Sequence, residues 1–254
     1  MQRLLSYRLA NLQGVGTRSQ QEDSFVVVNA FDVMKIKEQG LFFAVCDGMG
    51  GMADGALASQ TAVQSLKESF TSMSTASDLA EQLKKSVYRA SSEVESKIGG
   101  DGGSTLVGGI IYQEKLVYAS VGDSFLYLYR NGSLYRMNRE QNVCHSNYME
   151  AVKEGSVDPS DYQEHSDAAA LTGFLGMIGL EDIDCSVRPF PLMRGDVILA
   201  CSDGVGGVLM ENDIKAALEL PSEQDMCHRI EQKLVDYART NQDNYTAFVV
   251  KCVL

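Results

Sequence analysis

Acidic residues at the ends of apolar runs are the feature that most constrains this chain. An apolar run that stops on Asp-Gly places a carboxylate at a strand end, beside a glycine that lets the backbone turn and come close to a ligand. Several such ends meeting in one fold would bury charges that repel each other unless cations lie between them. Carboxylates without histidine or cysteine suit hard ions such as Mg²⁺ or Mn²⁺. The four acidic pairs are Glu22-Asp23, Asp47-Gly48, Asp203-Gly204 and Asp243-Asn244.

The spread of these pairs along the chain bears on domain organisation. The 254 residues contain no Pro-, Gly- or Ser-rich linker. A site assembled from residues 22 to 243 needs one continuous core, so we predict a single catalytic domain over 1–254.

Charge and cysteine content narrow the function further. A formal charge of −12 disfavours binding to nucleic acid and to anionic membranes. The six cysteines show no C-x-x-C spacing, which favours a reducing compartment. The first eleven residues lack the apolar core of a signal peptide, and no run is long enough to span a membrane. We therefore expect a cytoplasmic protein, and a monomer.

Hydrophobic periodicity predicts mixed secondary structure. Two helices lie between groups of closely spaced strands, which favours an α+β fold with two antiparallel sheets and helices outside them. Asp78 is the expected N-cap of the second helix. Residues 138–184 have weak periodicity and are predicted to form an irregular flap with short helices. The predicted strands are 25–29, 40–46, 105–112, 115–120, 125–130, 133–137, 196–201 and 245–253, and the predicted helices are 53–69, 79–97, 211–218 and 223–240.

Six motifs, taken in order, resemble the bacterial type of metal-dependent Ser/Thr protein phosphatase, the protein phosphatase 2C (PPM) family. The resemblance runs from about residue 8 to residue 253 and implies a four-layer α-β-β-α sandwich with a two-metal centre at one end of the central sheets. The motifs are Arg18-Ser-Gln-Gln-Glu22-Asp23, Asp47-Gly-Met-Gly-Gly51, Gly103-Ser-Thr105, Gly122-Asp123-Ser124, Ser202-Asp203-Gly204 and Asp243-Asn244-Tyr-Thr246.

The resemblance implies a metal-ligand set. Asp47 is the candidate bridging ligand, with the Gly48 carbonyl beside it, and Asp203 and Asp243 complete the site with waters. Asp123 matches a position that holds a third, weaker ion, although it could instead cap a turn. Two Mn²⁺ or Mg²⁺ ions can clamp phosphoryl oxygens and lower the pKa of a bridging water, so that hydroxide attacks without a protein nucleophile.

Three further residues have implied catalytic roles. Glu22 and Asp23 would orient metal-bound water, and the alternative is a solvated acidic pair at a strand start. Arg18 matches the phosphate-binding arginine of the family, since a guanidinium can meet two phosphate oxygens at once; the alternative is an ordinary surface arginine.

The chain departs from the family pattern at three positions. Met49 stands where animal members commonly carry a histidine proposed as general acid, so water or another residue must protonate the leaving group. Phe125 replaces an arginine and Gln21 an asparagine. None of these changes removes an implied metal ligand.

These observations leave three functions to separate. The leading one is Mg²⁺- or Mn²⁺-dependent hydrolysis of phosphoserine and phosphothreonine in proteins, opposed in the cell by a Ser/Thr kinase. The second is a pseudophosphatase that binds phosphoproteins or partners through the same fold. The third is a calcium-binding module suggested by the Gly- and Asp-rich segment 47–55, which lacks the ligand spacing of an EF-hand.

Overall fold

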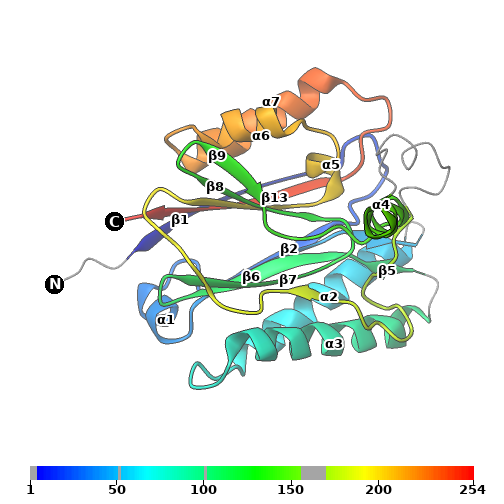
Figure 1. Cartoon of the computed structure of the whole chain (residues 1–254), viewed down its shortest axis with the longest axis horizontal. Helices are drawn as coiled ribbons and strands as arrows, with labels where there is room; N and C mark the ends of the chain where they lie inside the picture. Colours follow the sequence, from blue (N-terminus) through cyan, green and yellow to red (C-terminus); the bar gives the residue numbers. More distant parts are fainter. Residues whose placement is uncertain (1–4, 51–52, 100–101, 156–169) are drawn as a thin grey trace.

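The computed structural model describes residues 5–50, 53–99, 102–155 and 170–254. Two β-sheets lie face to face, with α6 and α7 covering one outer face and α2 and α3 the other (Figure 1). This arrangement confirms the predicted α+β class and the α-β-β-α order of layers.

The first sheet has five strands in the order β1-β13-β12-β8-β9, all antiparallel. Cys201 at the end of one strand pairs with Ala247 near the start of the next, so the segments around Asp203 and Asp243 lie at the same end of the sheet. The strands are β1 (Ser6–Gly14), β13 (Tyr245–Val253), β12 (Val197–Cys201), β8 (Phe125–Arg130) and β9 (Ser133–Arg136).

The second sheet has the strand order β10-β7-β6-β3-β2, with β11 also paired to β7. Val45 pairs with Val107, which brings Asp47 beside the start of β6. A separate two-stranded ribbon, β4–β5, joins the residues just after Asp47 to those just before β6. The strands are β2 (Ser24–Val28), β3 (Leu41–Cys46), β4 (Gly48–Met49), β5 (Gly103–Ser104), β6 (Leu106–Tyr112), β7 (Lys115–Val121), β10 (Asp184–Cys185) and β11 (Phe190–Pro191).

Three hydrophobic cores hold the layers together, and β3 contributes to two of them. All six residues of β3 are buried. Because side chains alternate along a strand, Phe42, Ala44 and Cys46 pack toward α2 and α3, whereas Leu41, Phe43 and Val45 pack between the sheets. The rings of Phe43 and Phe248 stack at 5.6 Å across the two sheets. A strand that is apolar on both faces needs a layer on each side, which is what the sandwich provides.

The helices follow their local sequence signals. Asp78 caps α3, as predicted, by accepting hydrogen bonds from the amides of Ala80 and Glu81, and α3 ends at Gly99 in the left-handed conformation. The helices are α1 (Val33–Glu38), α2 (Ala53–Thr71), α3 (Leu79–Ile98), α4 (Val143–Glu154), α5 (Asp203–Gly206), α6 (Glu211–Leu218) and α7 (Glu223–Tyr237). Within the described stretches, no helix combines the length and apolar character needed to cross a membrane.

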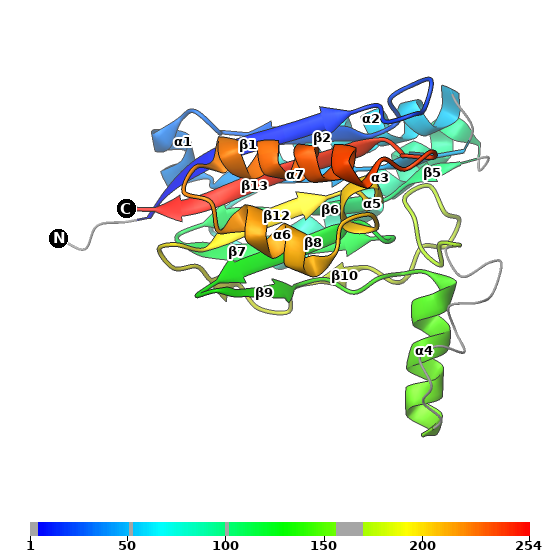
Figure 2. The ribbon, with the colours of Figure 1, turned by 90° about the horizontal axis from the view of Figure 1, so that it is seen from above.

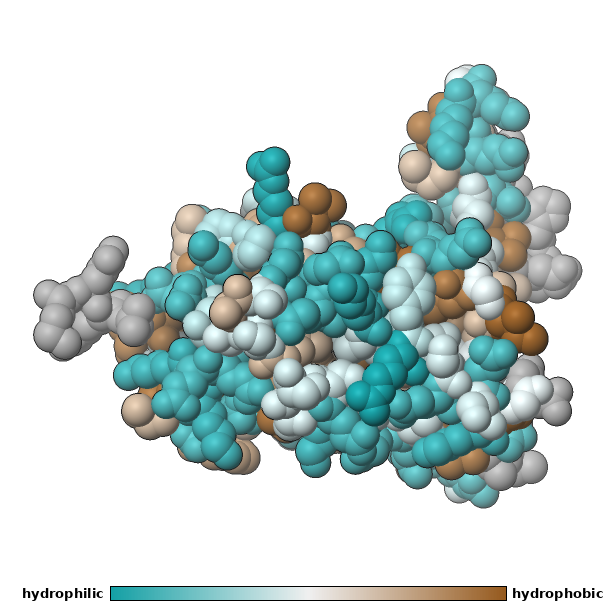
Figure 3. Space-filling model, turned by 90° about the horizontal axis from the view of Figure 1, so that it is seen from below, coloured by the Kyte–Doolittle hydropathy of each residue, from teal (hydrophilic) through white to brown (hydrophobic). Residues whose placement is uncertain are grey.

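Helix α4 falls inside the predicted flap and projects from the body of the molecule (Figure 2). Most of the face seen in Figure 3 is hydrophilic, and hydrophobic side chains occur on and beside this projection. Met149 and Val152 of α4 are 39% and 42% exposed. Residues 156–169 of the predicted flap lie outside the described residues.

Candidate metal and phosphate site

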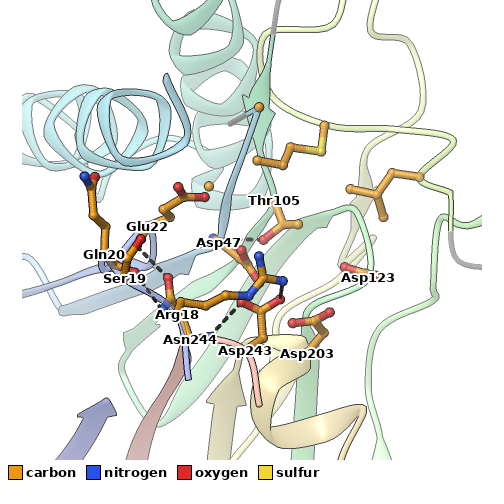
Figure 4. Close-up of a pocket in the computed structure, with 14 residues that line it drawn as sticks. Arg18, Ser19, Gln20, Glu22, Asp47, Thr105, Asp123, Asp203, Asp243 and Asn244 are labelled. Carbon is orange, nitrogen blue, oxygen red and sulfur yellow. Dashed lines mark hydrogen bonds and ion pairs between the residues drawn. The ribbon is translucent and has the colours of Figure 1, made fainter. Parts of the chain in front are cut away.

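A cavity of about 450 Å³ opens where the two sheets end, on the side that carries β5 and α5. Of the candidate site residues, Arg18, Glu22 and all five candidate metal ligands line this cavity (Figure 4). Asp23 does not line it; this residue is 4% exposed and lies behind it. The full lining is Arg18, Ser19, Gln20, Glu22, Asp47, Gly48, Met49, Gly50, Thr105, Asp123, Leu171, Asp203, Asp243 and Asn244.

Thr105 holds the segment at the end of β3. Its amide donates to the Asp47 carbonyl at 2.8 Å, and its hydroxyl accepts from the Asp47 amide at 3.0 Å. The same hydroxyl lies 2.7 Å from the Ser124 hydroxyl, next to Asp123. This threonine therefore ties two candidate ligand segments together.

The glycines of the two Asp-Gly pairs permit close backbone contacts. A Cβ on Gly48 would lie 2.0 Å from the Gly55 carbonyl oxygen, and one on Gly204 would lie 1.9 Å from the Asn244 carbonyl oxygen. Neither contact leaves room for a side chain. Glycine at these positions lets the backbone beside Asp47 approach α2 and the backbone beside Asp203 approach the segment that carries Asn244.

Burial and mutual repulsion act together on the carboxyls. Burial raises the pKa of Asp47 well above its usual range, and repulsion from Asp23 and Asp203 raises it further. Burial raises the pKa of Asp203 in the same way. Burial and the nearby Asp203 raise the pKa of Asp123 to about 7. In the absence of a cation, this cluster therefore favours protonated carboxyls.

Among the described residues at this site, two buried carboxylate oxygens have no hydrogen-bond partner: Oδ1 of Asp23 and Oδ1 of Asp203. Unpartnered buried carboxylate oxygens are costly, and divalent cations with their waters would satisfy them. The donor set around the cavity is oxygen-only, which fits Mg²⁺ or Mn²⁺. On both grounds, the residues present fit the metals that the sequence implied.

The arrangement is not an all-protein cage. Across the part of the chain that the structure describes, no three acidic, histidine or cysteine side chains converge as a closed ligand cluster. Mg²⁺ commonly keeps several waters and binds through one or two carboxylates, so an open arrangement suits such ions. It does not suit a dedicated calcium loop, in which most ligands come from protein oxygens.

Arg18 approaches one of the candidate ligands. Its Nη2 lies 2.5 Å from Oδ2 of Asp243, and the side chains of this pair are 58% and 39% exposed. Glu22 lies on the same side of the cavity, and burial raises its pKa while Arg18 lowers it.

Sequence reasoning missed three residues that shape the site. Leu171 lines the cavity from beyond α4. Ser202, the residue before Asp203, hydrogen-bonds the Asp23 carboxylate. Gln141, at the base of the flap, bonds both backbone groups of Gly122, beside Asp123. The signal for Ser202 was present in its motif, whereas Leu171 and Gln141 carry no local pattern.

Comparison with known proteins agrees with this geometry. Residues 7–147 match the family model described as protein phosphatase 2C. The chain belongs to the protein phosphatase 2C family. A curated relative, "Serine/threonine phosphatase stp" of Listeria monocytogenes, is 31% identical over 195 residues, which are 74% of this chain and 75% of the relative.

Solved structures with the same fold cover nearly the whole chain. The Mycobacterium tuberculosis serine/threonine phosphatase PstP/Ppp superposes with a TM-score of 0.81 at 24% identity, over 99% of this chain and 100% of that one. A PstP catalytic domain in complex with two manganese ions gives a TM-score of 0.78 at 24% identity, again over 99% and 100%. The family assignment and fold predicted from the motifs are confirmed. The expected manganese or magnesium requirement agrees with the two ions in that related phosphatase.

Proposed function

We propose that the protein hydrolyses phosphoserine and phosphothreonine in proteins through a two-metal centre. The observation that carries the proposal is that four aspartates from separate segments, two of them with strongly raised pKa values, line one cavity that also contains an arginine. The names of the relatives, which are serine/threonine phosphatases, support the same reaction class.

The metals would be held by Asp47, the Gly48 carbonyl, Asp203 and Asp243, with Asp123 as the position of a third, weaker ion. Bound divalent ions would supply positive charge to phosphoryl oxygens and lower the pKa of a water. The chain's own contribution is positional: Thr105 fixes the backbone of Asp47, and Asn244 donates its amide to Oδ1 of Asp243 at 2.8 Å.

The remaining side chains act on the substrate and its surroundings. Arg18 can donate two N–H groups to phosphate oxygens and so orient the phosphoryl group. Asp23, buried behind the cavity, and Glu22, on its wall, would accept hydrogen bonds from ordered waters. Met49 has no proton to donate, so the leaving alkoxide takes its proton from water or from another group.

We also propose a domain organisation, an oligomeric state and a cellular compartment for this activity. The catalytic unit would be one domain over 1–254 with a flap at about 138–184, acting as a monomer in which a single chain supplies all five candidate metal ligands. Its six cysteines are free, which suits the reducing cytoplasm. A Ser/Thr kinase would supply the phosphorylated substrates.

The test is phosphate release from a phosphothreonine peptide and from p-nitrophenyl phosphate, with Mn²⁺ and with EDTA. We expect turnover with Mn²⁺ and none above background with EDTA. Tight phosphopeptide binding without phosphate release at saturating Mn²⁺ would overturn the proposal in favour of a pseudophosphatase.

A further inference from the structure

Arg18 and Asp243 form an ion pair inside the cavity, although they come from opposite ends of the sequence. Arg18 belongs to the loop between β1 and β2, and Asp243 to the loop before β13. Oδ2 of Asp243 accepts from Arg18 at 2.5 Å, and Oδ1 accepts from the Asn244 amide at 2.8 Å. Both carboxylate oxygens of this candidate metal ligand are therefore engaged by groups of the chain itself (Figure 4).

The two loops are fastened to each other on both sides of this pair. Asn244 donates its side-chain amide to the carbonyls of Val15 and Gln20, each at 2.9 Å, and accepts from the Glu22 amide at 2.7 Å. The loop segment that carries Arg18 is thus bonded before and after the arginine.

A second attachment lies at Thr17, whose amide and hydroxyl both donate to the Gln242 carbonyl, at 2.8 and 3.0 Å. An exposed ion pair between two long, mobile side chains contributes little because ordering them costs entropy. Here the two backbones are already joined, so the guanidinium is held close to Asp243 at a smaller entropic cost.

We propose that Arg18 is the resident counter-cation of Asp243 and that a divalent ion displaces it, which frees the guanidinium for phosphate. The inference rests on the proposed function, because it assumes that Asp243 binds metal and Arg18 binds phosphate. A guanidinium bonded to the carboxylate offers fewer N–H groups to a phosphate. Metal binding at Asp243 therefore prepares the anion site as well as the metal site.

The linkage must be reciprocal. If metal releases Arg18 and so strengthens phosphate binding, phosphate must draw Arg18 away from Asp243 and strengthen metal binding by the same factor. Arg18 would then pair first with Asp243 and afterwards with phosphate. The negative charge of Asp243 is balanced by Arg18 before the metal binds and by the metal afterwards.

The first test is Mn²⁺ binding measured by calorimetry in phosphate-free buffer. Arg18→Gln should bind Mn²⁺ about two- to fivefold more tightly than the wild type at the site that includes Asp243, the range expected for loss of one partly exposed pair. Arg18→Lys, which keeps the charge, should remain closer to the wild type.

Arg239→Gln is the matched control. Arg239 is exposed, lies four residues before Asp243 and does not line the cavity. The same loss of charge should leave Mn²⁺ affinity unchanged there. Unchanged or weaker Mn²⁺ binding by Arg18→Gln would overturn the inference, as would equal tightening in both variants.

The second test observes the arginine itself. In protein labelled with ¹⁵N-arginine, the Nε–H resonance of Arg18 is assigned by its loss in Arg18→Lys. Diamagnetic Mg²⁺ should shift this resonance and speed its exchange with water, and inorganic phosphate should then shift it again only when Mg²⁺ is present. If Mg²⁺ binds but the Arg18 resonance does not respond at saturation, the displacement inference is overturned and the proposed function stands. If no metal binds at all, both the inference and the proposed function are overturned.

Discussion

The hydroxyl of Ser202 donates a 2.8 Å hydrogen bond to Oδ2 of Asp23 and joins the two sheets behind the cavity. Ser202 follows β12 of one sheet, and Asp23 precedes β2 of the other. The same hydroxyl accepts from the Thr246 amide at 3.0 Å, so one oxygen connects three segments that border the site. Both residues are buried, and the second carboxylate oxygen of Asp23, Oδ1, has no hydrogen-bond partner among the described residues.

Ser202→Ala should therefore destabilise the fold. The substitution would remove the hydrogen-bond partner of the Thr246 amide and of Oδ2 of Asp23, which costs about 1–3 kcal/mol of unfolding free energy. Urea denaturation measures this change. Ser133→Ala, at the exposed start of β9, is the control and should change stability little. A Ser202→Ala protein as stable as the wild type would show that the bridge contributes nothing.

Asp47→Asn should separate metal binding from folding. Asparagine cannot ionise and therefore cannot repel the neighbouring carboxylates, so the metal-free variant should be as stable as the metal-free wild type or more so. Its activity should fall by about a thousandfold or more, since loss of metal charge costs several kcal/mol in the transition state. Melting curves with Mn²⁺ and with EDTA, together with phosphate release, give both quantities.

The matched control for this variant is Asp54→Asn. Asp54 also precedes a glycine, but it lies in the first turn of α2 and does not line the cavity. The control should keep both its activity and its stabilisation by Mn²⁺. Activity of Asp47→Asn within tenfold of the wild type would contradict the assignment of Asp47 as a shared ligand.

The stability of the metal-free protein should depend on pH with a defined sign. Burial raises the pKa of Asp23 to about 6 and that of Asp123 to about 7, whereas an unfolded aspartate ionises near pH ~3.9. Between these values the folded state retains protons that the unfolded state releases. The stability that this provides is complete below the unfolded pKa and is lost as pH rises through about 6 to 7.

The experiment is urea denaturation in EDTA at about pH 5.5 and about pH 8, repeated with Mn²⁺, which replaces the protons as counter-charge. The stabilisation by Mn²⁺ should be larger at the higher pH. Asp123→Asn should reduce the pH dependence in EDTA. Metal-free protein that is more stable at the higher pH would show that the carboxyls are not held protonated.

Asp123 should affect turnover more than it affects the core metals. Asp123→Ala leaves Asp47, Asp203 and Asp243 in place, so two tight Mn²⁺ ions should remain by calorimetry. Hydrolysis of a phosphothreonine peptide should slow by roughly tenfold, equivalent to about 1.4 kcal/mol. Full peptide activity in Asp123→Ala would remove its proposed role at a third ion.

Much of the fold could be predicted because its strands are strongly apolar. The runs that became β3, β12 and β13 are buried on both faces, so their hydrophobicity stands out without any alternation. Strand β1 was missed because it is a partly exposed edge strand with polar residues, stabilised mainly by pairing with β13. Helix α1 was missed because six residues with no buried side chain carry little periodicity.

Some features of the candidate site could likewise be predicted from the sequence, and others could not. The aspartates could be predicted because each follows or precedes a run that the fold must bury. The Arg18–Asp243 pair could not, because it depends on two loops, 225 residues apart, that meet only in the folded chain. The burial of Asp23 behind the cavity likewise depends on both sheets, which a local pattern does not describe.

Gln141 should couple the base of the flap to Asp123. It is 3% exposed, and its side-chain oxygen accepts from the Gly122 amide at 2.8 Å while its side-chain nitrogen donates to the Asp182 carbonyl at 2.8 Å. Its own carbonyl accepts from the Thr172 amide at 2.8 Å. Gln141 thus connects the turn that carries Asp123 with two segments that follow α4, one at Thr172 and one at Asp182.

Gln141→Ala should leave the Gly122 amide unpaired and loosen these connections locally. Hydrogen exchange should become faster at 120–123 and 170–182, but not in β3 or β12, and the two tight Mn²⁺ ions should remain. Turnover of a phosphothreonine peptide should fall more than turnover of p-nitrophenyl phosphate, because the small substrate needs less of the surrounding wall. Gln64→Ala, on the exposed face of α2, is the control and should change none of these. A uniform increase in exchange across both sheets would show instead that Gln141 supports the whole fold rather than this corner of the site.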